Sequence, residues 1–312
     1  MNMFALIASF GGGIIGAYMG ALPAFILTGV VAIAGAAVSM AGGADLTVGF
    51  VAFGSYLGPH IAFAGGVAAA AYAARNKKLG DGTDILSCLN GLSDPATLVV
   101  GGIFGVLGFL IHYVLGSVLH LNTDLPGCTV IISGIIARLV FGTSGLLGKA
   151  PAGQVRAYFT RGKGMVCNIL LGLGIGTASG FVYQALADTG ASAAVLGSYP
   201  VLCFGIAAVS LIFTQTGFAM PGTHHIALIS ALAAVTSANP VMGTVFGILA
   251  SLFGDFVGKT FNSHCDSHID PPAFTIFVFT LLLICCLEQA SSVFNQYVRI
   301  SFILSRRKPE IS

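Results

Sequence analysis

Apolar residues run along the chain in long blocks that short polar stretches separate. A block of roughly twenty apolar residues has the length at which an α-helix crosses the hydrocarbon core of a bilayer. A membrane-spanning β-barrel would instead alternate apolar and polar residues in segments of roughly ten. The pattern therefore predicts an all-α polytopic integral membrane protein with about 9–10 transmembrane helices. We place the blocks at about 4–22, 24–41, 48–74, 95–119, 128–148, 164–186, 195–213, 215–237, 240–262 and 271–287.

Two of these blocks contain residues that interrupt helices. Gly58-Pro59 lies near the middle of 48–74, and Pro221-Gly222 lies within 215–237. Proline removes a backbone donor and clashes with the preceding turn, so we expect a broken helix at each position. Broken backbone is tolerated at membrane depth only inside protein or along a water-filled cavity, so the breaks mark candidate binding positions.

The composition narrows the class further. Only 8% of the 312 residues are charged and 56% are hydrophobic, with a mean hydropathy of +0.94. A soluble domain carries about 25% charged residues, so this chain lacks the polar surface that water requires. The net charge of +2 suits neither a disordered chain nor a basic nucleic-acid-binding face. No Walker, Rossmann or HExxH motif occurs, so we expect no enzyme and no ATPase.

Basic residues gather in three clusters, which the positive-inside rule assigns to the cytoplasm. Because five apolar blocks, an odd number, separate the second and third clusters, we predict a re-entrant hairpin at 240–262 and the residues after it. The result is about nine crossings with the N-terminus outside; ten plain crossings are the alternative. We interpret the chain as a multi-pass protein of the cell membrane, of the bacterial inner-membrane type. The clusters are Arg75, Lys77 and Lys78; Lys149, Arg156, Arg161 and Lys163; and Arg299, Arg306, Arg307 and Lys308.

Short similarities recur in the same order along the chain and indicate a duplication. We predict a first repeat at 1–119, a linker span with a cytoplasmic loop at 120–163, a second repeat at 164–298 and a basic cytoplasmic tail at 299–312. The single linker span would invert the second repeat, and inverted repeats in transporters place the substrate site at their interface. The recurring pairs are Gly20-Ala21-Leu22-Pro23 with Gly197-Ser198-Tyr199-Pro200, His60-Ile61-Ala62 with His225-Ile226-Ala227, and Asp94-Pro95-Ala96 with Asp270-Pro271-Pro272-Ala273.

Asp94 and Asp270 each precede a proline, a pattern typical of a helix N-cap followed by proline at the first helical position. A carboxylate placed there can also hold a cation or proton. Asn90 and Ser93 precede Asp94 and could line the same site. We therefore predict that these residues contact substrate or coupling ion, with capping alone as the alternative.

Histidines follow both breaks, His60 the first and His224 and His225 the second, with Thr223 beside the second. A histidine inside an apolar segment is costly unless paired, and it titrates near neutral pH. We predict that these residues contribute to the substrate or coupling-ion site. The alternative is that each is buried and satisfied by a carbonyl of a neighbouring helix.

The polar run 262–270 contains His264, Cys265, Asp266 and His268. His264 and His268 would share one face of a helix, a spacing that suits a divalent transition metal. The alternatives are a proton-coupled polar gate and an ordinary loop at the membrane surface. Elsewhere in the apolar blocks, we expect Arg138 to have a structural role, extending to the cytoplasmic edge, with binding of an anionic substrate as the alternative. We expect Asp255 to pair with Lys259, with a gate or cation site as the alternative.

Glycine runs have the small-xxx-small spacing that lets helices pack closely, at Gly12, Gly16 and Gly20 and at Gly172, Gly176 and Gly180. Such faces could also join subunits, so we expect a homo-oligomer. Taken together, the sequence predicts a membrane transporter for a small polar or ionic solute, coupled to protons or sodium. The alternatives are a passive channel, a membrane-embedded metal-binding protein or metalloenzyme, and a membrane subunit of a larger importer. No organic cofactor is expected.

Overall fold

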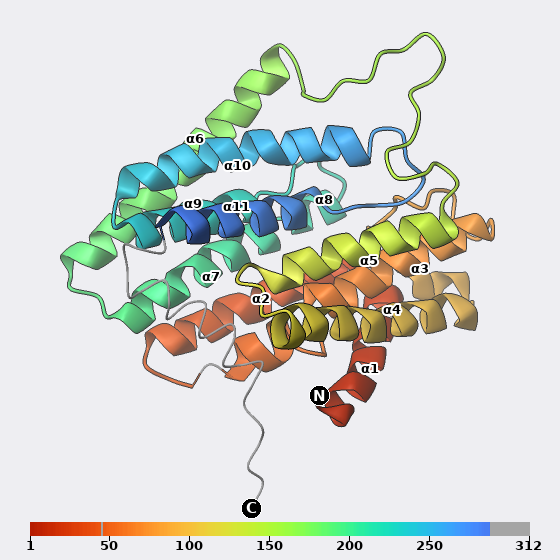
Figure 1. Ribbon diagram of the computed structural model, residues 1–312, viewed down its shortest axis with the longest axis horizontal. Coiled ribbons are helices and arrows are strands. Elements are labelled where there is room, and N and C mark those ends of the chain that lie inside the picture. The colour runs from red at the N-terminus through yellow and green to blue at the C-terminus, as the bar shows by residue number, and fades with distance from the viewer. Residues whose placement is uncertain (45, 288–312) are drawn as a thin grey trace, which may run out of the picture.

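The computed structural model describes residues 1–44 and 46–287, and these residues form helices and no strands. The predicted all-α class is confirmed for this part of the chain. In Figure 1 most helices run across the view in one common direction, so the connections between them gather at two opposite ends of the molecule. The predicted basic tail at 299–312 and the end of the second repeat lie outside the described residues.

Within residues 1–44 and 46–287, five helical segments are long and apolar enough to cross a membrane, and four shorter apolar helices accompany them. The long segments are Ala21–Met40, Pro95–Val118, Lys163–Asp188, Ala193–Gln215 and Pro240–Phe261. The elements are α1 (Met3–Met19), α2 (Ala21–Met40), η1 (Val48–Ala52), η2 (Pro59–Phe63), α3 (Ala64–Arg75), η3 (Leu89–Leu92), α4 (Pro95–Tyr113), η4 (Val114–Val118), α5 (Leu125–Phe141), α6 (Lys163–Asp188), α7 (Ala193–Val209), α8 (Ile212–Gln215), α9 (His224–Ser237), α10 (Pro240–Phe261) and α11 (Pro271–Leu287).

Polar residues with short side chains start many of these helices. Asn2, Asp94, Asp124, Ser192 and Asn239 each accept a hydrogen bond from a backbone N–H in the first turn of the helix that follows. Such caps accept hydrogen bonds from backbone N–H groups that have no partner within the helix. An unpaired N–H group is costly in an apolar environment.

Both interruptions lie where the prolines predicted them. The π-helical turn η1 ends at Ala52, and η2 begins only at Pro59, before continuing into α3. Likewise α8 ends at Gln215, and α9 begins at His224. Each interruption leaves a helix that starts inside the bundle rather than at its surface.

The helix α10 occupies most of the stretch where we predicted a hairpin, 240–262 and the residues after it. It runs unbroken for 22 residues from Pro240 to Phe261, capped by Asn239, so this stretch contains no hairpin turn. The prediction depended on counting crossings up to the basic residues after 298, which lie outside the described part of the chain. Charge counting cannot distinguish a hairpin from a span when the partner helices are unknown.

Glycines bring two pairs of helices into backbone contact. On α1 a Cβ at Gly13 would overlap the backbone oxygen of Gly101 on α4. On α6 a Cβ at Gly176 would lie 2.7 Å from the backbone oxygen of Gly243 on α10. The predicted close packing is therefore made between helices of the same chain, and the predicted homo-oligomer stays a prediction.

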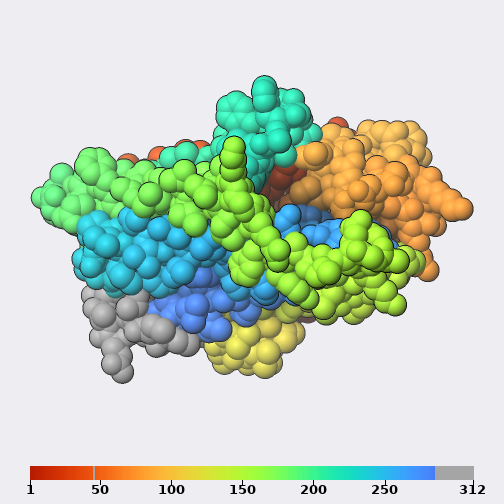
Figure 2. Space-filling model, turned by 90° about the horizontal axis from the view of Figure 1, so that it is seen from above, coloured from red at the N-terminus to blue at the C-terminus, as the bar shows by residue number. Residues whose placement is uncertain are grey.

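The helix α9 forms the centre of the second half of the chain. All of its residues from His224 to Thr236 are buried, and it contacts α6, α7, α10 and α11. The two halves meet where α2 packs against α7, with Gly29 against Gly205, and where α5 packs against α11. Figure 2 shows the yellow-green connection after α5 lying across one face of the molecule.

Candidate functional site

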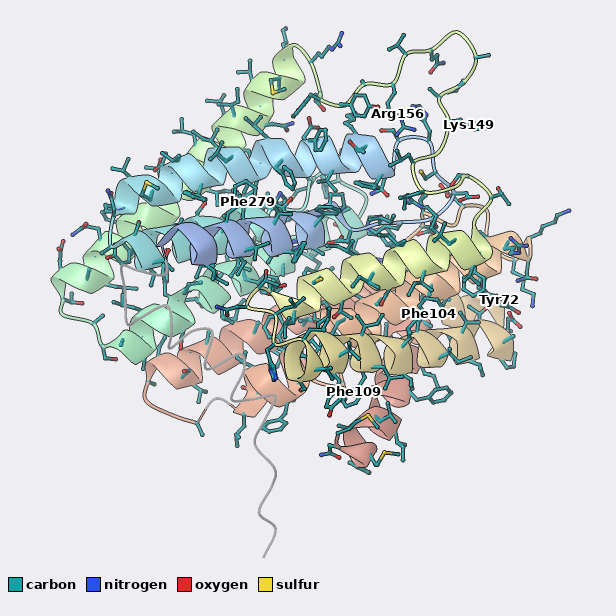
Figure 3. All side chains as sticks on the ribbon, viewed as in Figure 1. Tyr72, Phe104, Phe109, Lys149, Arg156 and Phe279 are labelled. Atoms are coloured by element: carbon teal, nitrogen blue, oxygen red, sulfur yellow. The ribbon has the colours of Figure 1, made fainter. Side chains whose placement is uncertain are left out.

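A cavity of about 970 Å³ lies between the two halves of the bundle. Residues of α1, α2, α4, α5, α7, α9 and α11 line it, together with the interrupted segment between α2 and α3. Phe109, labelled in Figure 3, contributes to its wall from α4. A volume of this size suits a small organic molecule rather than a single bare ion.

The two ends of the cavity differ. At one end, which we call the open end, the side chains of Met1, Phe4 and Phe50 are more than half exposed. At the other, the closed end, Phe25 lies against Phe63, Phe204 and the ring of His224, with centroid separations of 5.8, 5.6 and 4.6 Å. All four of these rings are buried.

Two histidines lining the cavity have unsatisfied nitrogens. The Nδ1 atoms of His60 and His224 are buried and have no hydrogen-bond partner among the described residues. The ring of His60 stacks on that of His112 from α4, with centroids 4.5 Å apart. Unpaired buried polar atoms are rare in folded proteins, and at a cavity wall they point to a ligand or ordered water as the partner.

Two aspartates bring negative charge to the cavity wall. Asp124 caps α5 by accepting from the Gly127 N–H at 2.6 Å, and Asp270 accepts from the Ala273 N–H at 2.7 Å at the start of α11. His268 lies with Nε2 3.2 Å from the second carboxylate oxygen of Asp270. Asp124 and Asp270 therefore each cap a helix and also line the cavity.

The other predicted carboxylate, Asp94, lies apart from the cavity. It caps α4 by accepting from the N–H and hydroxyl of Thr97, and it forms an ion pair of 2.9 Å with Lys78. The Thr97 hydroxyl and then the Lys78 ammonium lower the pKa of Asp94 below its ordinary value. Asn90 and Ser93 lie with it in the connection between α3 and α4 and do not line the cavity.

Consecutive residues at the start of α9 face different surroundings. His224 lines the cavity, whereas the Nε2 atom of His225 lies 2.6 Å from the position that a Cβ would occupy at Gly254 on α10. Thr223, just before the helix, is buried. Of the three predicted residues at the second break, the structure therefore places His224 at the cavity wall.

The 262–270 segment is an irregular loop, so the helical face expected to align His264 with His268 does not form. Asp266 instead accepts four hydrogen bonds from backbone and hydroxyl groups of Thr143 and Ser144, at 2.5–3.1 Å. Burial alone would raise the pKa of Asp266, but the bonds from Ser144 and then Thr143 outweigh it and lower the pKa to about 2. In residues 1–44 and 46–287, no three His, Cys, Asp or Glu side chains, Cys265 included, come together as metal ligands.

Arg138 holds this loop against α5. Its side chain is fully buried, and the guanidinium donates to carbonyl oxygens and to two side-chain oxygens. The role is structural, but the guanidinium is buried in hydrogen bonds rather than extended to the membrane surface as expected. The acceptors are the backbone oxygens of Leu146 (2.9 Å), Phe261 (2.5 Å) and Ser267, the Asn262 Oδ1 (3.2 Å) and the Ser267 hydroxyl (3.0 Å).

The pairing expected between Asp255 and Lys259 is replaced by a different contact. Both oxygens of Asp255 accept from Thr160, one from the backbone N–H at 2.7 Å and one from the hydroxyl at 2.6 Å. This contact ties the connection after α5 to α10. The same connection carries Arg156 and Lys149, labelled in Figure 3, and Arg156 donates to the Thr260 carbonyl oxygen.

Sequence reasoning missed Asp124 and His112 as cavity residues. A signal for Asp124 was present, because Asp124-Leu125-Pro126 repeats the pattern of an aspartate shortly before a helix with an early proline. His112 lies near the end of an apolar block, and nothing in its local sequence distinguishes an interfacial from a cavity position.

The model of one protein family matches residues 1–158 and 170–303, most of the chain. The chain belongs to DUF7973, a family of unknown function. No curated protein and no solved structure matches it. The two matched segments of the DUF7973 chain each cover one half of the bundle, with α1 to α5 in the first and most of α6 to α11 in the second.

Proposed function

We propose that this chain is a multi-pass membrane transporter for a small polar or ionic solute, working as a secondary transporter coupled to protons or sodium. The observation that carries the proposal is the cavity between the two halves, lined by exposed side chains at one end and by buried aromatic rings at the other. Helices that start inside the bundle, at Pro59 and His224, supply polar groups to its wall. Such discontinuous helices are typical of substrate sites in secondary transporters.

Two inverted repeats of five helices each account for this arrangement. In the first half α1 packs against α4 through glycines, and in the second half α6 packs against α10 through glycines. The interrupted segment leading into α3 corresponds to the one leading into α9. Because five is an odd number of crossings, the second repeat would lie upside down relative to the first.

The helix starts support the same correspondence of helices, in which Asp270 pairs with Asp124 rather than with Asp94 as expected from the sequence. Asp94 and Asn239 cap α4 and α10, and Asp124 and Asp270 occupy the equivalent positions before α5 and α11. In this scheme α5 is the last helix of the first repeat and no separate linker span is needed. The scheme gives ten crossings, the alternative noted from the sequence. Asp124 and Asp270 then become equivalent groups that face one cavity from opposite repeats.

The basic residues orient the molecule in the membrane. Arg75 donates to the Phe141 carbonyl oxygen at the end of α5, and the loop 262–270 is bound to the same region. The ring of Phe63 at the closed end lies 6.0 Å from the ring of His268 in this loop, so we place the closed end on the side that carries Arg75 and Lys78. The positive-inside rule assigns this side to the cytoplasm, so the cavity would be open outward.

Transport would require the closed end to open while the open end closes. The contacts that would separate are the rings around Phe25 and the bonds between loop 262–270 and the connection after α5. Histidine is the side chain that gains and loses a proton most readily near neutral pH, so His60 and His224 are the proposed sites of proton coupling. A sodium-coupled cycle would use the carboxylates instead.

Uptake by purified protein reconstituted in liposomes tests this function. A panel of labelled small solutes is offered under a proton gradient, a sodium gradient or no gradient. We expect at least one solute to accumulate above its equilibrium concentration under one of the two gradients, with saturable kinetics. Equilibration without saturation or accumulation would indicate a passive channel. Fluxes no greater than in empty liposomes for every solute would contradict transport.

A further inference from the structure

The charged side chains that line the cavity are all acidic. They are Asp124 and Asp270, and no Lys or Arg side chain lines it in the described part of the chain. The buried Arg138 does not line the cavity. Its guanidinium donates instead to Leu146, to Phe261 and to Asn262 in the loop 262–270. An uncompensated carboxylate at membrane depth is costly, and a bound cation removes that cost.

Each carboxylate is placed so that its charge remains available. A single oxygen of Asp124 or Asp270 accepts the capping N–H, so capping occupies only part of the acceptor capacity of the group. At Asp270 the other oxygen lies 3.2 Å from the Nε2 atom of His268. The cap also fixes the orientation of the group at the wall.

Aromatic rings form much of the rest of the wall. At the closed end the ring of Phe25 contacts the rings of Phe63 and Phe204. The ring centroids of Phe53 and Phe204 are 5.5 Å apart. Ring faces attract organic cations, and the attraction is stronger where water is excluded. An inorganic ion would leave most of a cavity of about 970 Å³ unfilled, whereas an apolar organic body would pack against these rings.

The unpaired nitrogens of His60 and His224 add acceptors. Each imidazole has one nitrogen able to accept a hydrogen bond when neutral, and in both rings Nδ1 has no partner among the described residues. A protonated amine carries several N–H donors, so it can bond a carboxylate and an imidazole together. A carboxylate solute would instead have to approach Asp124 and Asp270 against repulsion.

We propose that the solute is a small organic cation, an amine with an apolar body, whose ammonium group binds Asp270 at the closed end. Asp124 attracts the same charge on the opposite wall, and the apolar body packs against Phe25, Phe63 and Phe204. This inference rests on the proposed function, because it names the class of solute that the transport cavity takes.

Calorimetric binding to the purified full-length protein in detergent tests the charge requirement. The probes are 2-phenylethylammonium, its neutral analogue 2-phenylethanol, and the anion 3-phenylpropionate. We expect the cation to bind, the alcohol to bind at least about tenfold more weakly, and the anion not to bind.

The Asp270→Asn variant tests the assigned residue. Asparagine keeps a side-chain oxygen for the Ala273 N–H, so the cap remains while the charge is lost. We expect binding of the cation to weaken by at least about tenfold. The matched control is Asp188→Asn at the end of α6, where the carboxylate contacts Gln184 outside the cavity, and binding should be unchanged. Equal melting temperatures of the three proteins would show that the fold is retained.

Several outcomes would overturn the organic-cation inference. They are equal binding of the alcohol, preferential binding of the anion, no binding of any probe, and full affinity in the Asp270→Asn variant. These outcomes are distinguishable from a failure of the proposed function. Gradient-driven uptake of an anion would retain the transporter and reject the cation, whereas charge-dependent binding without any flux would do the reverse.

Discussion

The Arg138→Met variant is expected to lose about 3–5 kcal/mol of unfolding free energy. Methionine has a similar length but no donors, so the carbonyls of Leu146, Phe261 and Ser267 would lose their partner in a buried place. Leaving buried polar groups unpaired is the costly part of such a change. Titration with a denaturing detergent, followed by circular dichroism, measures the loss.

A matched control distinguishes the buried guanidinium from basic charge in general. Arg161→Met removes an exposed arginine from the connection after α5, and we expect a change within about 0.5 kcal/mol. Arg138→Lys keeps the charge but not the planar fork, so its unfolding free energy should lie between those of Arg138→Met and Arg161→Met. A loss below about 1 kcal/mol for Arg138→Met would contradict the role of Arg138 as the anchor of loop 262–270.

The Gly13→Ala variant is expected to be the second strongly damaging change, at about 1–3 kcal/mol or more. A methyl group there would overlap the backbone oxygen of Gly101, and the contact is with backbone, which cannot rotate away. The helices α1 and α4 would have to separate. Gly176→Ala on α6, where the Cβ would lie 2.7 Å from the Gly243 oxygen, should have an effect of the same sign.

Two neighbouring glycines serve as controls for these substitutions. A Cβ at Gly11 or at Gly174 meets no atom within 4 Å. Alanine favours a helix over glycine by about 1 kcal/mol, so both control variants should be neutral or slightly more stable. Thermal unfolding in detergent compares all four proteins. Equal melting temperatures of the Gly13→Ala and Gly11→Ala variants would contradict the claim that close glycine packing stabilises the contact between α1 and α4.

The features that the sequence predicted well are those encoded by neighbouring residues. The breaks at Gly58-Pro59 and Pro221-Gly222 follow from proline geometry, and the position of Asp270 before two prolines predicts its cap. Small residues spaced four apart on α1 and α6 predict close packing whatever the partner helix is. None of these requires knowledge of the tertiary arrangement.

The cavity could be predicted only in part, because its composition depends on which helices become neighbours. Asp94 and Asp270 have the same local sequence, yet Lys78 lies beside one and the cavity beside the other. His264 and His268 have metal-ligand spacing only on a helix, and the bonds of Asp266 to Thr143 and Ser144 hold the segment as a loop. The bonds of Asp266 join residues more than a hundred positions apart, so the local sequence does not reveal them.

The choice between nine and ten crossings shows the same limit for topology. The positive-inside rule fixes which connections are cytoplasmic, but it gives no information on whether 240–262 folds back. The unbroken helix α10, packed along α6 through Gly243 and Gly247, shows that 240–261 itself does not fold back. Its glycines were visible in the sequence, but their partners on α6 were not.

Uptake by liposomes containing the wild type, Asp270→Asn or Asp188→Asn tests the central claim most directly, that the cavity is the transport path. The solute is whichever member of the panel accumulates with the wild type. The account predicts that Asp188→Asn retains uptake and that Asp270→Asn reduces it by at least about tenfold, with equal amounts of folded protein in each membrane. Undiminished accumulation by the Asp270→Asn variant would contradict it.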